Sequence, residues 1–337
     1  MKKLAAIILA AGKGTRMKSD KPKVVFNFAE KPMIQRVVDT ALETNCDKIA
    51  TVVGFKKEIV IDSLQPNLKN IFIEQKKQNG TGHAVIVTEE VFKDFDGDIF
   101  ILCGDVPLLT SKTLKKILTK HQNKKAACTV LTAVMDDALK YGRIVRNIAG
   151  NVERIVEFKD ATAEQKEIKE INSGIYCFDA KSLFTALKSV NSDNMQGEYY
   201  LTDTLEILND QGKLVTSVLL DEIEEASGVN SQEQLADLEN LLYSKIRKHW
   251  LNNGVVIENP QSVIIGSDVN IEQNVEIAAN TIIKGNTIIK SGSRIGVNCY
   301  LLDSTIECNT KLQGFNVIVN STLKENSIIN FYDKRVN

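Results

Sequence analysis

Branched apolar residues recur every six positions near the end of the chain, and this period constrains the fold more than any other feature. The repeated positions are Ile265, Ile271, Ile277, Ile283, Ile289, Ile295 and Leu301. Valines precede the first three by two residues, and after a slip of one residue the count resumes at Ile306, Leu312 and Ile318. A hexapeptide period is typical of a left-handed parallel β-helix, in which each hexad forms one side of a triangular coil. We predict a short β-helix over residues 254–337, of about four coils, with the repeated side chains filling its interior.

The beginning of the chain has a different pattern. Leu4–Leu9 is an unbroken apolar run, too short for a helix and long enough for a strand buried on both faces. Gly12 and Gly14 follow it, and glycines let successive backbone N–H groups approach an anionic ligand. Arg16 and Lys23 then add two positive charges. These features describe a polyphosphate site, although an ordinary turn with surface cations is the alternative for this motif alone.

Two common phosphate motifs do not fit this turn. Met17 occupies the position where a dinucleotide-binding fingerprint needs its third glycine. The glycine and lysine spacing of a P-loop is also missing from the segment 12–15.

Strand-like and helix-like segments alternate over residues 1–120, which predicts a mostly parallel sheet covered by helices on both faces. The expected strands there are Leu4–Leu9, Lys48–Val53, Ile71–Glu74 and Asp98–Cys103. The expected helices are Met33–Thr44, Lys57–Gln65, Gly82–Val91 and Lys112–Gln122, the last with Ser111 as a possible N-cap. Further strands are expected at Ala127–Val134, Gly142–Arg146, Val152–Phe158, Gly174–Asp179 and Leu214–Leu219, and further helices at Ser182–Leu187 and Leu201–Asn209. We assign all of these elements to one α/β domain, residues 1–228.

A single amphipathic helix is expected to link this domain to the β-helix, within residues 229–253. Ser231–Gln234 fits a capping box. Apolar residues then recur at helical spacing and end at the only tryptophan: Leu235, Leu238, Leu242, Ile246 and Trp250. Packing explains this stripe better than a cofactor site does.

Composition excludes several classes of protein. A formal net charge of −1 over 337 residues gives no electrostatic reason to expect nucleic acid or an anionic membrane as partner. No run approaches the ~18 apolar residues of a membrane helix, and the apolar run after Lys2-Lys3 stops at Gly12 without a cleavage site for a signal peptide. The six cysteines form no C-x-x-C pair. We therefore expect reduced thiols and a cytoplasmic location.

An ordered series of short motifs resembles the bacterial sugar nucleotidyltransferases, most closely the N-acetylglucosamine-1-phosphate uridylyltransferase half of the GlmU family. The motifs cover residues 1 to about 230 and are Leu9–Met17, Lys23, Gln75 with Gly80–Ala84, Gly104–Leu108, Tyr141–Ile144, Ile155–Glu157 with Lys159–Ala161, Asn172–Tyr176, Gly197–Asp203 and Gly228–Asn230. Each motif is weak alone, but their common order is specific. The resemblance implies a Rossmann-like domain that joins UTP and N-acetylglucosamine 1-phosphate with the help of Mg²⁺.

The resemblance also assigns roles to residues. Arg16 and Lys23 would be catalytic, stabilising charge on the α-phosphate and the departing pyrophosphate. Asp105 and Asn230 would hold Mg²⁺, which needs few protein ligands. Arg16 and Lys23 could instead be surface charges, and Asp105 could be a structural aspartate. Asn230 owes its metal role wholly to the family, because Gly228–Asn230 alone reads as a turn.

The remaining expected contacts bind substrate. The base and phosphates would meet Leu9, Ala10, Ala11, Gly12, Gly14, Lys23, Gln75, Gly80, Thr81, Gly104, Asp105 and Asn230. A glutamine amide can pair with a donor and an acceptor on uracil, and Gly80 would let the backbone approach the base. The sugar would meet Gly142, Glu157 and Asn172, although Glu157 could also lie on the solvent face of a strand. We interpret His83 as structural.

Two departures from the family pattern bear on function. Cys103 stands where relatives often carry tyrosine, which puts contacts of that side chain in doubt. Full-length GlmU proteins continue their β-helix into an acetyltransferase site, whereas here none of the three histidines, His83, His121 and His249, lies in the hexapeptide region. We expect no acetyl transfer, and a homotrimer formed through the β-helix. A different sugar or base, or a catalytically silent regulatory subunit of the same fold, remain the alternatives.

Overall fold

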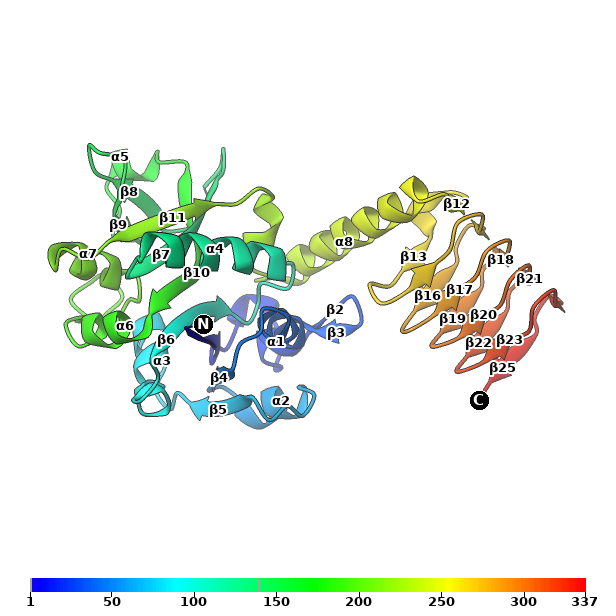
Figure 1. Ribbon diagram of the computed structural model, residues 1–337, viewed down its shortest axis with the longest axis horizontal. Coiled ribbons are helices and arrows are strands. Elements are labelled where there is room, and N and C mark those ends of the chain that lie inside the picture. Colours follow the sequence, from blue (N-terminus) through cyan, green and yellow to red (C-terminus); the bar gives the residue numbers. More distant parts are fainter. Residues whose placement is uncertain (1, 139) are drawn as a thin grey trace. The chain divides into compact units, whose positions relative to one another are not determined.

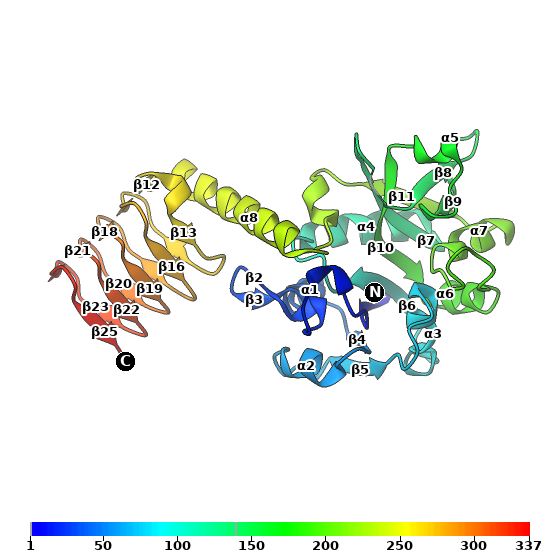
Figure 2. The ribbon, with the colours of Figure 1, turned by 180° about the vertical axis from the view of Figure 1, so that it is seen from behind.

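The computed structural model describes residues 2–138 and 140–337 and divides into two compact units (Figures 1 and 2). The first comprises Met1–Asn27 and Lys31–Gln232, and the second Phe28–Glu30 and Glu233–Asn337. The first unit is the α/β domain, and the second contains the β-helix and nearly all of the helix that precedes it.

One mixed sheet forms the centre of the first unit. Its strand order is β11-β7-β10-β6-β1-β4-β5, with β8 and β9 attached beside β10. Neighbours along this order are parallel except at β10, which runs antiparallel to β6 and β7. The strands are β1 (Lys3–Ala10), β4 (Lys48–Val53), β5 (Asn70–Glu74), β6 (Gly97–Cys103), β7 (Cys128–Val134), β8 (Arg143–Arg146), β9 (Val152–Val156), β10 (Glu170–Asp179) and β11 (Val215–Leu219). A short pair, β2 (Asn27–Phe28) and β3 (Lys31–Pro32), lies outside this sheet.

Helices cover both faces of the sheet, as the alternating pattern predicts (Figures 1 and 2). One face packs against α1 (Met33–Glu43), α2 (Lys57–Asp62) and α4 (Ser111–Lys124), and the other against α3 (Thr81–Ile86), α6 (Ala180–Leu187) and α7 (Asp203–Asp210). The short helix α5 (Ala163–Lys166) lies near β8. In β1, Ala5 and Ile7 join one core cluster, while Ala6 and Ile8 join the other. Alternate residues of a strand point to opposite faces of the sheet. A strand that is buried on both faces therefore needs an unbroken run of apolar residues.

Several expected boundaries were wrong, for example the end of α2, which is Asp62 rather than Gln65, and three further differences have a local reason. The N-cap of α4 is Thr110, whose Oγ1 accepts a hydrogen bond from the Thr113 N–H, and not Ser111. Strand β10 begins at Glu170 rather than Gly174, because the polar Asn-Ser-Gly segment forms a β-bulge inside the strand instead of ending it. Helix α3 stops at Ile86, and a separate 3-10 turn follows over Glu89–Phe92.

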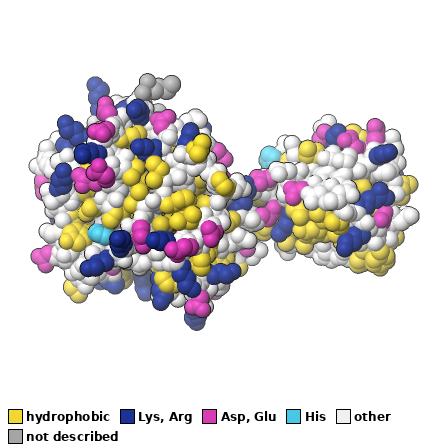
Figure 3. Space-filling view, turned by 90° about the horizontal axis from the view of Figure 1, so that it is seen from below, with side chains coloured by type: hydrophobic (Ala, Val, Ile, Leu, Met, Phe, Trp, Pro, Cys, Tyr) yellow, Lys and Arg dark blue, Asp and Glu magenta, His cyan; other side chains and the backbone are white. Residues whose placement is uncertain are grey.

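Charges of both signs are interspersed on the surface shown in Figure 3. This distribution agrees with the nearly neutral composition. Within the described residues, no helix combines the length and the apolar character needed to cross a bilayer.

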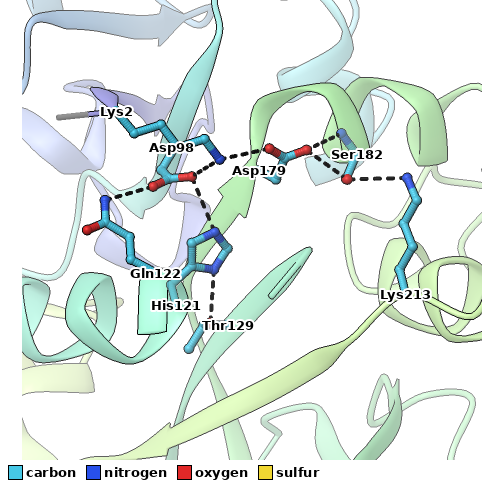
Figure 4. A network of polar contacts seen from close by, with 8 residues as sticks. All are labelled: Lys2, Asp98, His121, Gln122, Thr129, Asp179, Ser182 and Lys213. Carbon is cyan, nitrogen blue, oxygen red and sulfur yellow. Dashed lines mark hydrogen bonds and ion pairs between the residues drawn. The ribbon is translucent and has the colours of Figure 1, made fainter. Parts of the chain in front are cut away.

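A polar network ties strands together at the edge where β6 begins (Figure 4). The ammonium of Lys2 contacts Asp98 Oδ1 at 2.7 Å and Asp179 Oδ2 at 2.9 Å. Burial acts to raise the pKa of Asp98, but contacts from His121, Lys2 and Gln122 outweigh it and hold that pKa at about 2. The network therefore keeps a fully buried carboxylate ionised. The network lies at the amino end of β6, whereas Gly104 follows the carboxyl end of the same strand.

The second unit is a β-helix of three parallel sheets, as the period of six predicts. One sheet contains β12 (Val256–Ile257), β15 (Glu276–Ile277), β18 (Arg294–Val297), β21 (Lys311–Gly314) and β24 (Ile328–Ile329). The second contains β13 (Ile264–Ile265), β16 (Ile282–Lys284), β19 (Tyr300–Leu302), β22 (Val317–Val319) and β25 (Lys334–Val336), and the third β14 (Asn270–Ile271), β17 (Ile288–Ile289), β20 (Thr305–Ile306) and β23 (Thr322–Leu323). The repeated residues stack in register inside, for example Ile265 on Ile283 on Leu301.

The predicted one-residue slip is a shortened corner. Leu301 pairs with Ile318, one position fewer than separates Ile283 from Leu301, so the coil loses a residue after Leu301. A second slip, between Ile318 and Leu323, keeps the later coils equally short and was not predicted. Asparagines in the left-handed backbone region mark most corners: Asn274, Asn280, Asn298, Asn309, Asn320 and Asn326. Asparagine tolerates this conformation better than most residues.

Helix α8 (Gln232–Asn252) has the predicted length and position. Ile246 and Trp250, from the apolar stripe, pack against the core of the β-helix. Their role is packing, as the sequence indicates.

Candidate active site

The expected nucleotide-binding residues follow the carboxyl ends of neighbouring strands. Gly12 comes after β1, Gln75 after β5, and Gly104 with Asp105 after β6. The Gly104 N–H donates to the Leu9 carbonyl at 3.0 Å, so the two turns lie side by side. In an open α/β sheet this edge is where ligands bind. Leu9, Ala10 and Ala11 line it from β1 and the turn that follows.

Gly12 and Gly14 serve different purposes. A Cβ atom at Gly12 would meet no heavy atom within 4 Å, so the backbone there is open to a ligand. Gly14 has a φ of +66°, and a Cβ atom there would lie 2.5 Å from the Cβ of Lys23. Glycine at this second position lets the turn close on the stem of Lys23, which fixes where the lysine side chain begins.

Four residues from distant parts of the chain meet beyond β1 and β6. The Lys23 ammonium forms an ion pair with Asp105 Oδ2 and donates to Asn230 Oδ1 at 2.9 Å. The Arg16 Nη2 group donates to the same Asn230 oxygen at 2.7 Å. Asp105 and Asn230 are also joined through backbone, because the Val229 N–H donates to the Asp105 carbonyl at 2.9 Å. The predicted catalytic and metal-binding residues therefore form one cluster.

The Asp105 and Asn230 oxygens fit a divalent ion. A carboxylate oxygen and an amide oxygen converge on one positive charge, the Lys23 ammonium. Mg²⁺ prefers oxygen ligands and takes one or two from protein, the rest coming from water and phosphate. Among residues 2–138 and 140–337, no group of three or more His, Cys, Asp or Glu side chains could hold a metal. Asp105 and Asn230 are candidates for this role because their side-chain oxygens lie against the same ammonium.

The side chain of Gln75 is buried and held in place. Its Nε2 group donates to the Gly80 carbonyl at 3.1 Å and lies 3.0 Å from His83 Nδ1. An amide nitrogen only donates, so Nδ1 must be the acceptor. With Nε2 engaged in this way, Oε1 is the atom of Gln75 suited to accept from the N–H of a base. His83 thus orients the Gln75 amide, and its interpretation as a structural residue stays a prediction.

The segment 79–82 packs against the segment 197–201. The Gly82 N–H donates to the Tyr199 carbonyl at 2.7 Å, and the Leu201 N–H donates to Thr81 Oγ1 at 3.1 Å. A Cβ atom at Gly80 would lie 2.6 Å from the Tyr199 carbonyl oxygen. The space on the Cβ side of Gly80 is filled by this segment, whereas the expected approach of the Gly80 backbone to a base stays a prediction. Close packing of two chain segments explains the glycine.

Gly142, Glu157 and Asn172 come together, as predicted for the sugar side. The Asn172 N–H donates to the Gly142 carbonyl at 2.9 Å, and a Cβ atom at Gly142 would lie 3.5 Å from Glu157 Oε2. Glu157 is half-buried rather than on a solvent face. Burial raises the pKa of Glu157, and neighbouring carboxylates act in the same direction, whereas a hydrogen bond from Thr202 opposes them.

Sequence reasoning missed two residues that hold this site together. Thr202 Oγ1 donates to Glu157 Oε1 at 3.2 Å and leaves Oε2 facing Gly142. The Gln78 side chain donates to the Ala11 carbonyl at 2.6 Å, which ties the base side to the glycine turn. Thr202 lies inside a recognised motif, Gly197–Asp203, so its position was a usable signal. Nothing in the sequence marks Gln78.

Cys103 occupies the position at which relatives often carry tyrosine. Its thiol donates to the Gly174 carbonyl at 3.5 Å, and Sγ would lie 3.1 Å from a Cβ atom at Gly174. Burial raises the pKa of this thiol to about 12, so it stays protonated at neutral pH. It fills space beside the β-bulge.

The family model for nucleotidyl transferases matches residues 5–251. Bifunctional protein GlmU of Limosilactobacillus reuteri (strain DSM 20016) is 41% identical over 333 residues, which cover 99% of this chain and 71% of that protein. The chain belongs to the GlmU family of nucleotidyl transferases. Another GlmU protein, of Listeria monocytogenes serotype 4a (strain HCC23), is 43% identical over 274 residues, which cover 81% of this chain and 60% of the relative.

Solved structures agree with this assignment at the level of the fold. The crystal structure of UDP-glucose pyrophosphorylase complexed with UDP-glucose matches with a TM-score of 0.60 and 20% sequence identity. The match covers 73% of this chain and all of the pyrophosphorylase chain. It supports the α/β architecture that places the glycine turn, Asp105 and Gln75 at one sheet edge.

Proposed function

We propose that the chain is a uridylyltransferase that makes UDP-N-acetylglucosamine and pyrophosphate from UTP and N-acetylglucosamine 1-phosphate, with Mg²⁺. The observation that carries this proposal is the cluster of Arg16, Lys23, Asp105 and Asn230 at the ligand-binding edge of the sheet. Membership of the GlmU family supports it. A silent regulatory subunit would have no need to keep all four residues.

The residues divide the work of this reaction. The sugar phosphate is already a nucleophile, so no general base is required, and its oxygen attacks the α-phosphorus as the bond to pyrophosphate breaks. Arg16 and Lys23 stabilise the charge that develops on the phosphates. Gln75 selects the base, while Glu157 and Asn172 bind the hydroxyl and N-acetyl groups of the sugar. Mg²⁺, when bound by Asp105 and Asn230, would neutralise phosphate charge.

Pyrophosphate release over a grid of substrates tests the proposal. UTP, dTTP, CTP and GTP are each combined with N-acetylglucosamine 1-phosphate, glucose 1-phosphate and glucosamine 1-phosphate. We expect the highest kcat/KM for UTP with N-acetylglucosamine 1-phosphate. A different best pair would keep the chemistry and change the substrate. No release with any pair would favour the regulatory subunit.

We also propose that the β-helix assembles the protein into a homotrimer. On the first four strands of the sheet β13-β16-β19-β22-β25 the outward residues Ile264, Ile282, Tyr300 and Val317 are apolar, and Lys334 follows them on β25. The neighbouring sheet presents Glu276, Arg294 and Lys311 on its three middle strands, with Val256 and Ile328 on the two end strands. Hydrophobic side chains also gather on part of the β-helix surface in Figure 3. Three identical apolar faces suit closed cyclic symmetry.

Light scattering coupled to gel filtration checks the trimer. At micromolar concentration we expect the mass of three 37.4 kDa chains. Replacing Ile282 and Val317 together by glutamate places two charges on the apolar face, and we expect that variant to elute as a monomer. A wild-type protein that is monomeric at this concentration contradicts the proposal.

The acetyl transfer of bifunctional relatives is, we propose, not carried by residues 1–337. The amine of glucosamine 1-phosphate must lose a proton as it attacks a thioester, and histidine is the usual base. The β-helix sequence 254–337 contains no histidine. With acetyl-CoA and glucosamine 1-phosphate, we expect no sugar-dependent release of free thiol. Release above the rate without sugar would show that the chain carries both activities.

A cytoplasmic location is part of the proposal. All six cysteines have free thiols. Burial raises the pKa of Cys46 to about 12 and moves the pKa of Cys128 and Cys177 in the same direction. Such cysteines act as small apolar residues of the core, which supports a reducing compartment.

A further inference from the structure

The side-chain oxygen of Asn230 accepts from two cations at once. Arg16 Nη2 lies 2.7 Å and Lys23 Nζ 2.9 Å from Oδ1. An amide oxygen has two lone pairs, so these two contacts use both of them. The same lysine ammonium is paired with Oδ2 of Asp105, in a part-buried setting where the two side chains are 17% and 19% exposed. A positive charge therefore lies between the two oxygens assigned to the divalent ion.

The ammonium in this position and a divalent ion on the same oxygens exclude each other. Mg²⁺ takes its oxygen ligands at about 2.0–2.1 Å and needs a lone pair of each. Asn230 can offer one only if Lys23 or Arg16 withdraws, and two cations on one carboxylate oxygen also repel each other. The stem of Lys23 is packed against Gly14, so the ammonium would leave by rotation about the terminal bonds of its side chain.

We propose that Lys23 is a competing counter-ion for the divalent metal. The ammonium and the ion occupy Asp105 Oδ2 and Asn230 Oδ1 in turn, and the phosphates of a bound nucleotide draw the ammonium away. Metal binding is thereby conditional on the nucleotide, and Lys23 reaches the phosphates in the same step that frees the metal ligands. This inference rests on the proposed function for the assignment of a divalent ion to Asp105 and Asn230.

Binding of Mn²⁺ alone, without nucleotide, tests the competition directly. Free Mn²⁺ is measured by its electron paramagnetic resonance signal during titration of the full chain. Lys23→Met keeps the packed stem but removes the charge, and we expect it to bind Mn²⁺ at least about tenfold more tightly than wild type, about 1.4 kcal/mol. Lys23→Ala should behave in the same way. Asp105→Asn, combined with Lys23→Met, should remove the gain.

Two control variants separate local competition from a change in net charge. Lys23→Arg keeps a positive charge in the site and should not gain affinity. Lys57→Met removes a lysine that is paired with Glu74 at 2.7 Å elsewhere in the same unit, and should bind Mn²⁺ as wild type does. Thermal melting confirms that each variant is folded.

The outcomes distinguish this inference from the proposed function. If folded Lys23→Met and Lys23→Ala bind Mn²⁺ within threefold of wild type, the competition is overturned, whatever the pyrophosphate assay shows. If they gain affinity while the wild type turns over no nucleotide, the competition stands and the uridylyltransferase proposal fails.

Discussion

Replacing Arg16 by alanine is expected to lower kcat by about two to three orders of magnitude, equivalent to about 3–4 kcal/mol, with a much smaller change in KM. The contact of Arg16 with Asn230 uses one of the five N–H donors of the guanidinium. The others can bridge phosphate oxygens, and this interaction strengthens only as negative charge builds in the transition state. Arg16→Lys should be faster than Arg16→Ala because it keeps the positive charge. It should stay slower than wild type because lysine lacks the planar pair of donors.

Steady-state kinetics of pyrophosphate release measure this effect. Lys21→Ala is the matched control, since it removes an exposed cation of the same loop that makes no side-chain contact with the Asp105 and Asn230 cluster. We expect its kcat to stay within about twofold of wild type, as is usual for surface substitutions. Equal activity of Arg16→Ala and wild type would remove Arg16 from the mechanism.

Asp105→Asn is expected to abolish turnover at ordinary Mg²⁺ concentrations while leaving the protein folded. The carboxylate is the one negative side chain in the cluster with Arg16, Lys23 and Asn230. Asparagine keeps the shape and the backbone contact with Val229, but not the charge that attracts a divalent ion. Loss of a metal's stabilisation of transition-state charge is worth several kcal/mol, so we expect a decrease of at least about a thousandfold.

A titration of activity against Mg²⁺ separates loss of metal binding from loss of fold. The thermal midpoint of Asp105→Asn should lie close to that of wild type. Asp221→Asn, which breaks an exposed ion pair with Lys116 (2.8 Å), is the matched control and should retain full activity. Normal turnover of Asp105→Asn at low Mg²⁺ would show that the ion is held elsewhere.

The architecture could be predicted because it is recorded in periodicity. A spacing of six can repeat from Ile265 to Leu301 only where each side chain faces the same interior, and the structure stacks these residues in register. The second slip, after Ile318, could not be predicted because only Leu323 and Ile329 follow it, and two residues are too few to reveal a shifted repeat. The ends of strands were harder to predict where polar residues lie inside the strand, as Asn172 and Gly174 do in β10.

The site was harder to predict than the fold, since motifs name residues but not contacts. The sequence brought Arg16, Lys23, Asp105 and Asn230 to attention through the family pattern. It could not show that Lys23 lies on Asp105, because a side-chain contact between positions so far apart depends on packing. It also did not show that the missing side chain of Gly80 makes room for the Tyr199 backbone.

That contact between segments 79–82 and 197–201 is one part of a longer chain of interactions. Gln75 is bound to Gly80, Gly82 to Tyr199, and Thr81 to Leu201. The next residue, Thr202, holds Glu157 on the sugar side. The groups proposed to read the base and the sugar are therefore linked by one series of hydrogen bonds.

These hydrogen bonds couple the residues proposed to bind the base to those proposed to bind the sugar. A mutation at Gly80 would disturb its contact with Tyr199 and, through Leu201 and Thr202, the hydrogen bond that holds Glu157. If the proposed roles are right, a change in base preference made there is expected to alter the handling of the sugar as well. Protein engineers face the same constraint. To transplant one specificity from a relative, residues 75–82 and 197–203 should be exchanged as a single cassette.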